Sequence, residues 1–484
     1  MTRTSLSHLI ELAALTVGDR FGRIGVTFCP GKKQPGAMTG AWDRDLDIDL
    51  DSVAGWGAAV LVSLIEAHEI ATLEVAGLGE AVAARQMEWA QLPIIDVSVP
   101  CPQFEQAWVE VGEGLRSRLR DGFDVVVHCK GGLGRAGTIA ARLLVELGHE
   151  PRSAINLVRD ARPGALETAA QVEHVLAIQP VPERQPSQTN DATRDRAIGA
   201  MLGLAVGDAV GTTLEFSQRD SYPPLADMIG DGPFGLEAGQ WTDDTAMALA
   251  LADSLAQNPE LDPNDLMSRF VEWHERGAYS CTGHCFDIGM TTRRALDRFK
   301  RNGDPIAGST DPMSAGNGSL MRLAPAAVAH WRDRQKLAEV AALQSQTTHG
   351  APEAVSACVI YADMLADAIE GRTRSEVLRH RDEGAGGLRQ IMAGSWRGKS
   401  RSEIRSSGYV SHSLEAAIWS VGRTADFRSA VLTAANLGDD ADTTAAIAGQ
   451  LAGAIYGVRG IPTAWLDKLA WRERLQSTAD RLMG

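Results

Sequence analysis

The segment HCKGGLGRAGT, residues 128–138, combines residue types that could attack and hold a phosphate group. Cys129 supplies a thiol, and inward-facing backbone amides at a helix N-terminus would lower its pKa toward that of a nucleophilic thiolate. The glycines let the backbone curl so that these amides point at an anion. Arg135 could grip two phosphate oxygens and stabilise the transition state. The loop comprises Cys129, Lys130, Gly131, Gly132, Leu133, Gly134 and Arg135.

A dinucleotide-binding loop is the alternative interpretation, because Gly132, Gly134 and Gly137 satisfy the spacing G-x-G-x-x-G. Such a site needs an acidic residue about twenty positions further on, at the end of a second strand. The segment ELGHEPRSAINLV that follows contains no such strand. A dinucleotide loop also leaves the adjacent His128 and Cys129 unexplained, so a phosphate loop is favoured.

Displacement at phosphorus also needs an acid that protonates the leaving oxygen. Asp96 lies in LPIIDVSVP, where an apolar run gives way to a loop, which is a suitable place for a mobile acid. Taken alone, Asp96 would be interpreted as a solvated loop aspartate.

The signature H-C-x5-R in HCKGGLGR resembles that of the protein tyrosine and dual-specificity phosphatases. The segments RIGVTFCPGKK, GWGAAVLVSLIE, LPIIDVSVP and RDARPGALETAAQ resemble those around the site in the kinase-associated phosphatase branch, across residues 15–178. The resemblance implies an α/β cysteine-phosphatase fold with Cys129 as the nucleophile and Arg135 as the phosphate clamp. It makes Asp96 the acid and then the base, and Gln171 matches the position that helps place the hydrolytic water.

The chain departs from this family directly after the arginine. The family usually has Ser or Thr there, and its hydroxyl stabilises the thiolate that leaves in the second step. Here the position is Ala136, and Thr138, two residues later and early in a helix, should face elsewhere. We therefore expect slowed hydrolysis of the phosphocysteine intermediate.

Two acidic clusters lie far apart in the second part of the chain, each at an expected helix start. Carboxylates at such positions are often simple helix caps. Oxygen-only clusters without His or Cys suit Mg²⁺ better than Zn²⁺. If the clusters converge, they could hold two metal ions that position a sugar diol and a water. Their members are Thr242, Asp243, Asp244, Asp440, Asp442 and Thr443.

The segments AIGAMLGLAVGDAVGTTLEF, WTDDT, SAGNGSLMRLAPAAV, TTHGAPEA and GDDADTTAAIAGQLAGAIYG resemble successive motifs of the ADP-ribosylglycohydrolase family, across about 194–460. The resemblance implies an all-α domain with two Mg²⁺ ions bound by the six residues above. The family often has Gly-Gly-Asp at Gly438-Asp439-Asp440, so metal binding is assigned to Asp440. Glu215 would hold or activate groups at the reacting ribose. The pyrophosphate and ribose pocket would be lined by Ser314, Gly316 and Asn317, with His349 and Tyr409 nearby.

The secondary structure expected around these residues differs between the two parts of the chain. Apolar runs at 58–65, 92–99 and 123–129 predict buried strands, and residues 105–119 predict a helix between them. The polar segment 181–193 has the composition of a linker. Beyond it, segments such as 353–371 and 429–437 have helical periodicity. We expect a multidomain protein: an α/β phosphatase domain at 1–180, a linker at 181–193 and an all-α domain at 194–484.

Composition restricts the partners of the chain. A net charge of −15 over 484 residues argues against nucleic acid as a main ligand. The longest apolar segment, near AAIAGQLAGAIYGV, is interrupted by Gln450 and predicts a buried helix, and the N-terminus lacks a signal pattern. Six scattered cysteines indicate no disulfide framework, and CTGHC lacks the second ligand pair of a zinc site. We expect a cytoplasmic protein without membrane contact.

The favoured hypothesis is a bifunctional hydrolase that cleaves phosphomonoesters and, with Mg²⁺, ADP-ribosyl linkages. Its partners would be an ADP-ribosylated protein or small-molecule adduct and a phosphorylated protein or small phosphate ester; a phosphorylated ADP-ribose derivative could serve both sites. Alternatively, the phosphatase-like domain mainly binds phosphorylated ligands and targets the hydrolase to them. An inert helical domain is the third hypothesis, against which both intact acidic clusters argue.

Overall fold

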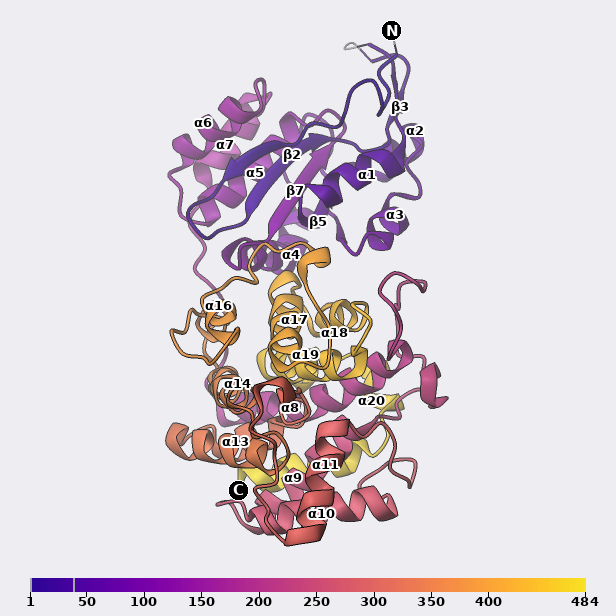
Figure 1. Cartoon of the computed structure of the whole chain (residues 1–484). Helices are drawn as coiled ribbons and strands as arrows, with labels where there is room; N and C mark the ends of the chain where they lie inside the picture. The colour runs from indigo at the N-terminus through magenta and orange to yellow at the C-terminus, as the bar shows by residue number, and fades with distance from the viewer. Residues whose placement is uncertain (1, 38–39) are drawn as a thin grey trace. The chain divides into compact units, whose positions relative to one another are not determined.

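The computed structural model describes residues 2–37 and 40–484, and the chain forms two compact units, Met1–Arg184 and Gln185–Gly484. The first unit combines a sheet with helices and the second is helical (Figure 1). This arrangement confirms the predicted fold class.

A five-stranded sheet with the order β1-β2-β7-β5-β6 forms the centre of the first unit. Strand β1 is antiparallel to β2, and the other neighbours are parallel. The strands of this sheet are β1 (Ala13–Thr16), β2 (Arg23–Phe28), β5 (Ala58–Ser63), β6 (Glu88–Gln91) and β7 (Asp124–Cys129), while β3 (Lys33–Gln34) and β4 (Trp42–Asp43) form a separate pair.

Helices cover both faces of this sheet, as Figure 1 shows. One apolar core includes residues of α4, α5, α6 and α7, and a second includes residues of α1 and α3, with Ile70 of α2 packed against it. Strands buried on both faces need continuous apolar runs, which explains the sequences of β5 and β7. The helices are α1 (Leu46–Gly55), α2 (Ala67–Thr72), α3 (Leu78–Ala84), α4 (Pro102–Arg120), α5 (Gly134–Glu146), α6 (Pro151–Ala161) and α7 (Ala169–Ala177).

The predicted strands at 58–65 and 123–129 are confirmed as β5 and β7, and the helix at 105–119 as α4. The strand predicted at 92–99 is wrong, because β6 ends at Gln91 and a loop follows. Val97 has a φ of +63°, which an extended strand does not allow. Ile94 is nevertheless buried in the core, so core packing explains the apolar run.

Two helices with small residues on their facing sides form the centre of the second unit. Helix α8 packs antiparallel against α19, with Gly199 against Gly453 and Gly203 against Gly449. A Cβ atom at position 203 would lie only 2.2 Å from the Gly449 carbonyl oxygen, so the two backbones are in direct contact. This close approach brings the C-terminal end of α8 to the N-terminal end of α19.

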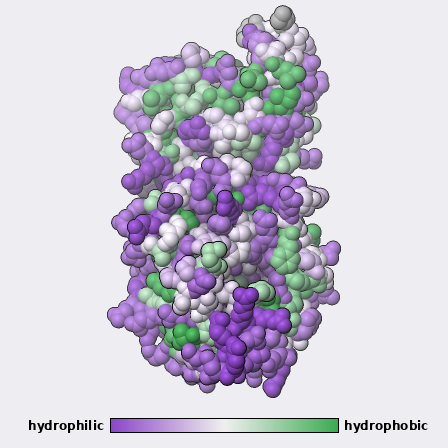
Figure 2. All heavy atoms as spheres, in the orientation of Figure 1, coloured by the Kyte–Doolittle hydropathy of each residue, from purple (hydrophilic) through white to green (hydrophobic). Residues whose placement is uncertain are grey.

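The other helices surround this pair, and the face in Figure 2 carries hydrophilic residues over most of the helical unit. The helical predictions at 353–371 and 429–437 are confirmed as α14 and α18. The helices are α8 (Asn190–Gly211), α9 (Asp243–Gln257), α10 (Pro263–Arg276), α11 (Met290–Asn302), α12 (Ala324–His330), α13 (Arg334–Thr348), α14 (Pro352–Glu370), α15 (Arg374–Val377), α16 (Leu388–Met392), α17 (Val410–Arg423), α18 (Phe427–Ala435), α19 (Ala441–Tyr456), α20 (Thr463–Lys468) and α21 (Arg472–Met483).

Helix α8 differs from the sequence-based expectation in two respects. It begins at Asn190, because the Thr189 side chain caps it by accepting a hydrogen bond from Ala192 N, so the end of the polar segment 181–193 is helical. Residues Asn190–Leu214, rather than the segment around Gln450, have the length and apolar composition to cross a membrane. Of their most apolar stretch, 94% is buried inside the protein, as in a core helix.

Candidate functional site

The phosphate loop joins the end of β7 to the start of α5. Cys129 is the last residue of β7 and is 3% exposed, and Gly132 N donates a hydrogen bond to its Sγ at 3.2 Å. Gly132 has a φ of +71°, and a Cβ atom there would lie 2.5 Å from the Thr27 carbonyl carbon. Only glycine fits this position, which aims a backbone amide at the thiol.

Two basic side chains donate hydrogen bonds to backbone carbonyls of this loop. Arg162 Nε donates to Gly132 O at 3.2 Å and Lys32 Nζ donates to Lys130 O at 3.2 Å. Because these carbonyls are directed to basic groups outside the loop, the amides of the loop are free to face an anion beside Cys129.

Arg135 lies in the first turn of α5, and its guanidinium contacts two carboxylates from other segments. Its guanidinium donates to both oxygens of Glu69 at 2.6 and 2.9 Å, and one nitrogen lies 3.0 Å from Asp96 Oδ1. Burial acts to raise the pKa of Glu69, but hydrogen bonds from Arg135 hold it below its ordinary value. Sequence reasoning missed Glu69, since nothing in the pattern of α2 marks it as the partner of a residue 66 positions away.

Asp96 and Gln171, which lie on a loop and on α7, are also close to the phosphate loop. The Asp96 side chain is 53% exposed on the loop after β6, where a mobile acid can reach a ligand. Gln171 in α7 is fully buried and donates its Nε2 to Ser98 O at 3.3 Å, which ties α7 to the Asp96 loop. A Cβ atom at Gly134 would lie 2.9 Å from Gln171 Nε2. The fold therefore gathers the four residues expected to act on phosphate.

No hydroxyl group follows Arg135 directly. Ala136 is fully buried in the first turn of α5. Thr138 Oγ1 donates to Gly134 O at 2.8 Å, so its own helix engages this hydroxyl. The geometry agrees with the expectation that Thr138 faces elsewhere.

A histidine beside the nucleophile predicts a pH dependence of stability. Burial lowers the pKa of His128 from 6.5 to about 4. Since the folded value lies below the unfolded one, His128 stabilises the fold fully above pH 6.5, and this stabilisation is lost as the pH falls through 4. Between pH 7.5 and 4 we expect the free energy of unfolding of the wild type to fall by roughly 3 kcal/mol more than that of His128→Gln, in urea titrations. His8→Gln, at an exposed histidine, should keep the wild-type slope, and a His128→Gln profile as steep as the wild type would contradict the prediction.

In the second unit the two acidic clusters converge. Thr242 Oγ1, at the start of α9, lies 3.1 Å from Asp442 Oδ2 in the first turn of α19. Thr443 Oγ1 lies 3.3 Å from Asp244 Oδ2, which joins the clusters a second time. Asp440 accepts a hydrogen bond from Asn317 Nδ2 at 2.7 Å. All six predicted ligands thus lie around one place, where the starts of two helices meet.

The caps of these two helices come from α8 and the turn after it. Asp208 accepts from Thr242 N at 2.9 Å and Thr245 N at 3.0 Å, while Glu215 Oε2 accepts from Ala441 N at 2.7 Å. The side chains at the N-cap positions of α9 and α19 make no cap hydrogen bond themselves. The interpretation as simple caps therefore does not fit Thr242 and Asp440.

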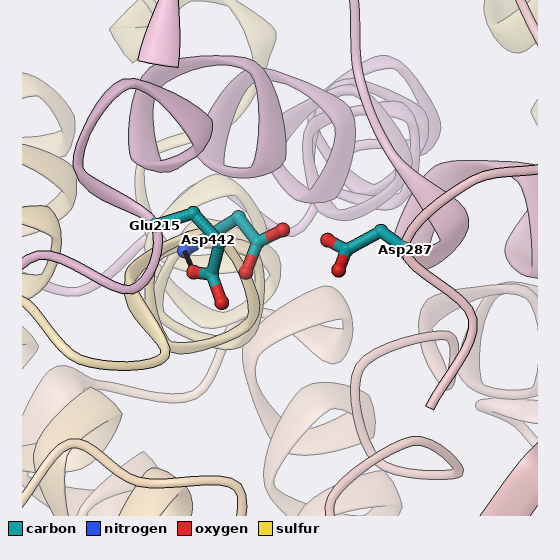
Figure 3. Close-up of side chains that lie close together, drawn as sticks. All are labelled: Glu215, Asp287 and Asp442. Atoms are coloured by element: carbon teal, nitrogen blue, oxygen red, sulfur yellow. Dashed lines mark hydrogen bonds between the residues drawn. The ribbon is translucent and has the colours of Figure 1, made fainter. Parts of the chain in front are cut away.

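Glu215, Asp287 and Asp442 form a compact group of carboxylates, each offering an oxygen within 4.8 Å of the others. Figure 3 shows the Asp287 carboxylate pointing from its loop toward the other two. Sequence reasoning missed Asp287 and Asp208. Asp287 stands in an irregular loop before α11, with no repeat or spacing to mark it. Asp208 lies inside a motif noted above, but its place in the last turn of an apolar helix was its only signal.

This concentration of carboxylates shifts their protonation. Burial and the charge of Asp442 raise the pKa of Asp208 and of Asp440 to about 7, and that of Asp287 to about 11. The pKa values of Asp243, Asp244 and Glu215 are raised for the same reasons. The buried Asp244 Oδ1 has no hydrogen-bond partner among the described residues. Oxygen donors, repelling charges and an orphaned carboxylate oxygen fit a site for hard divalent cations.

A cavity of about 580 Å³ opens onto these carboxylates. Gly316, Asn317 and His349 line it, together with Glu215, Asp243, Asp440, Asp442 and Thr443, whereas Thr242 and Asp244 lie buried behind its wall. Burial lowers the pKa of His349 to about 3, so its imidazole is neutral. Ser314 and Tyr409 are not among the lining residues: Ser314 Oγ donates to Asp311 O at 2.6 Å, and Tyr409 Oη donates to Glu353 at 2.5 Å.

Comparison with known proteins identifies the family of each domain. The family model "ADP-ribosylglycohydrolase" matches residues 189–484, and "Swiss Army Knife protein, DSP-PTPase phosphatase domain" matches residues 34–175. The chain is 47% identical over 298 residues to the ADP-ribosylarginine hydrolase Tri1 of Pseudomonas putida, covering 61% of this chain and 79% of the relative. It is 35% identical to the ADP-ribosyl-[dinitrogen reductase] glycohydrolase of Rhodospirillum rubrum, covering 58% and 92%.

A solved structure described as an ADP-ribosylglycohydrolase-related protein complex matches with a TM-score of 0.54 and 39% identity, over 60% of this chain and 98% of that one. The family match spans the carboxylate cluster and its cavity, and the phosphatase match spans the loop around Cys129. The chain therefore belongs to the ADP-ribosylglycohydrolase family and carries a DSP-PTPase-type domain ahead of its glycohydrolase domain.

Proposed function

We propose that the C-terminal domain is a Mg²⁺-dependent hydrolase that removes ADP-ribose from arginine side chains, and that the N-terminal domain hydrolyses phosphate monoesters. The observation that carries the first proposal is the buried carboxylate cluster facing the cavity at the starts of α9, α11 and α19. The arginine linkage is favoured because two relatives named ADP-ribosylarginine hydrolase are 45–47% identical to this chain.

In this proposal the residues of the cavity divide the work. Glu215 Oε2 is engaged by backbone amides of α19, which fixes its carboxylate at the reacting centre. Asp287 faces it from the opposite loop. During hydrolysis the bond between the anomeric carbon and the acceptor nitrogen breaks and water supplies the new oxygen. One of these carboxylates takes a proton from the water, and the acceptor nitrogen gains a proton as it leaves. Neutral His349 packs against Gly316 and Gly318 and shapes the substrate wall.

The metal ions would be held by the six residues of the two clusters. Bound Mg²⁺ would supply Lewis acidity and orient the ribose hydroxyls. The candidate ligands are Thr242, Asp243, Asp244, Asp440, Asp442 and Thr443.

The test is release of ADP-ribose from a peptide modified on arginine, measured with Mg²⁺ and with EDTA, beside a serine-modified peptide. We expect release from the arginine peptide with Mg²⁺, loss of release with EDTA and recovery when Mg²⁺ is added back. Full activity in EDTA would contradict the metal requirement, and cleavage of the serine peptide alone would contradict the proposed linkage.

For the N-terminal domain, the proposed reaction is displacement by Cys129, with Arg135 holding the phosphate and Asp96 protonating the leaving oxygen. Turnover of an aryl phosphate by the wild type, abolished in Cys129→Ser, is the expected result. A second candidate function, binding of phosphorylated ligands, is favoured by Ala136, because this position lacks the hydroxyl that assists turnover while the phosphate-binding loop and Arg135 are kept. Binding of a phosphopeptide without turnover would support that candidate instead.

Replacing Ala136 by serine is expected to accelerate turnover. Serine would return a hydroxyl beside the thiolate that leaves when the phosphocysteine is hydrolysed, and such a hydrogen bond is worth about tenfold in rate. In stopped-flow measurements with an aryl phosphate, the wild type should show a burst followed by a slow phase. Ala136→Ser should speed the slow phase and leave the burst rate unchanged. Ala136→Gly serves as the control, since it adds no hydroxyl; an equal gain in both variants would contradict the prediction.

A further inference from the structure

Three phenylalanines form a row that begins at the wall of the glycohydrolase cavity. Phe216 lines the cavity and packs edge-on against Phe234, with ring centroids 6.1 Å apart. Phe234 packs against Phe286 at 5.2 Å. Each end of the row adjoins a cavity carboxylate in the sequence, because Phe216 follows Glu215 and Phe286 precedes Asp287. The aromatic row thus lies beside the two carboxylates at the reacting centre.

The exposure of Phe216 is unusual for so large an apolar side chain. It is 67% exposed, although it lines the cavity. Its backbone has a φ of +60°, and Asp287 and Asp439 in the same cavity wall have φ values of +57°. Side chains with a Cβ atom rarely adopt such values, and backbone strain of this kind clusters at ligand sites. Phe216 is therefore exposed to solvent although both its backbone conformation and its apolar side chain make this position unfavourable.

The supporting loops fix this row in place. Phe216 N donates to Asp439 O at 2.8 Å, which ties it to the loop before α19. Phe234 ends the short turn Gly232–Phe234, which is closed by paired backbone hydrogen bonds between Asp231 and Leu236. A Cβ atom at Gly232 would lie 2.3 Å from Thr212 O, so this turn packs directly on the segment that leads into Glu215. Backbone contacts therefore fix the aromatic row next to the segment that carries Glu215.

We propose that this row, with Glu215 and Asp287 beside it, is the subsite for the guanidinium group of the acceptor arginine. A guanidinium is a flat cation that stacks on aromatic faces and pairs with carboxylates, and the row offers both kinds of partner side by side. The scissile bond joins the anomeric carbon to this group, so the acceptor must lie next to the reacting carboxylates. Adenine is separated from that bond by a pyrophosphate and a second ribose. The inference rests on the proposed arginine linkage.

The test compares Phe216→Leu with the wild type on an arginine-modified peptide. Leucine keeps an apolar side chain but removes the aromatic face, so we expect KM to rise about tenfold with a smaller change in kcat. Phe286→Leu should change KM in the same direction, and Phe216→Tyr should restore it. Inhibition by free ADP-ribose, which lacks the acceptor, should stay at the wild-type level in all variants. Phe21→Leu, the same substitution in the first unit, is the matched control.

The other outcomes are decisive as well. An unchanged KM in Phe216→Leu would overturn the subsite. Parallel weakening of ADP-ribose inhibition would also overturn it and assign the row to adenine. If the wild type failed to cleave arginine-modified peptides but cleaved another linkage, the proposed function would fall instead. Thermal unfolding of Phe216→Leu at the wild-type temperature would show that the fold is intact.

Discussion

Asp442→Ala is expected to lower the rate of ADP-ribose release more than about 100-fold, because loss of one supporting residue at a metal site already costs 10- to 100-fold. Asp442 contacts residues of both halves of the candidate metal site. It lies 3.1 Å from Thr242 Oγ1, belongs to the tight group with Glu215 and Asp287, and raises the pKa values of its acidic neighbours. The measurement is kcat for an arginine-modified peptide at saturating Mg²⁺.

Asp439→Asn is the matched control for this prediction. Asp439 lies three residues away and lines the same cavity, but its backbone carbonyl is what contacts Phe216 N. Asparagine keeps the shape and tolerates the positive φ at this position, so most activity should remain. Equal losses in the two variants would show that the charge of the region, rather than a specific ligand, sustains activity. Isothermal titration with Mg²⁺ should show weakened binding only for Asp442→Ala.

Gly203→Leu is expected to lower the free energy of unfolding of the helical unit by roughly 3 kcal/mol or more. A Cβ atom at this position would lie 2.2 Å from Gly449 O and 3.1 Å from the Phe427 ring, so α8 and α19 must separate. The gain of about 1 kcal/mol in helix propensity over glycine is too small to offset this clash. Because α8 contains Asp208 and leads into Glu215, separation should also weaken the metal site. Urea titration and the Mg²⁺ affinity of the surviving folded protein check both effects.

Gly387→Ala is the control substitution in the same unit. A Cβ atom there would meet the Glu353 carboxylate at 3.4 Å and Ser411 Oγ at 3.6 Å, which are ordinary contacts. Its φ is −67°, so alanine brings no strain. We expect a change below about 0.5 kcal/mol, as for most substitutions away from packed contacts. A Gly203→Leu protein as stable as Gly387→Ala would contradict the account of the α8–α19 contact.

The sequence by itself determined the features that depend on local pattern. The apolar runs of β5 and β7, the helical periodicity of α14 and α18, and the spacing from Cys129 to Arg135 are all short-range, so they could be recognised without coordinates. The same holds for the two acidic clusters, because each is contiguous and starts a helix. The strand predicted from the apolar run at residues 92–99 was nevertheless wrong. The backbone there is a loop, and its apolar residues are explained by burial in the core.

Only the tertiary structure decided which distant groups meet. Glu69 became the partner of Arg135, and Asp287 joined Glu215 and Asp442, through contacts between elements that share no sequence pattern. Asp208 and Glu215 cap two helices whose starts lie 34 and 226 residues away, because glycines let α8 and α19 touch along their backbones. A carboxylate acquires its role from the charges and amides around it, and those neighbours are chosen by packing rather than by proximity in the chain.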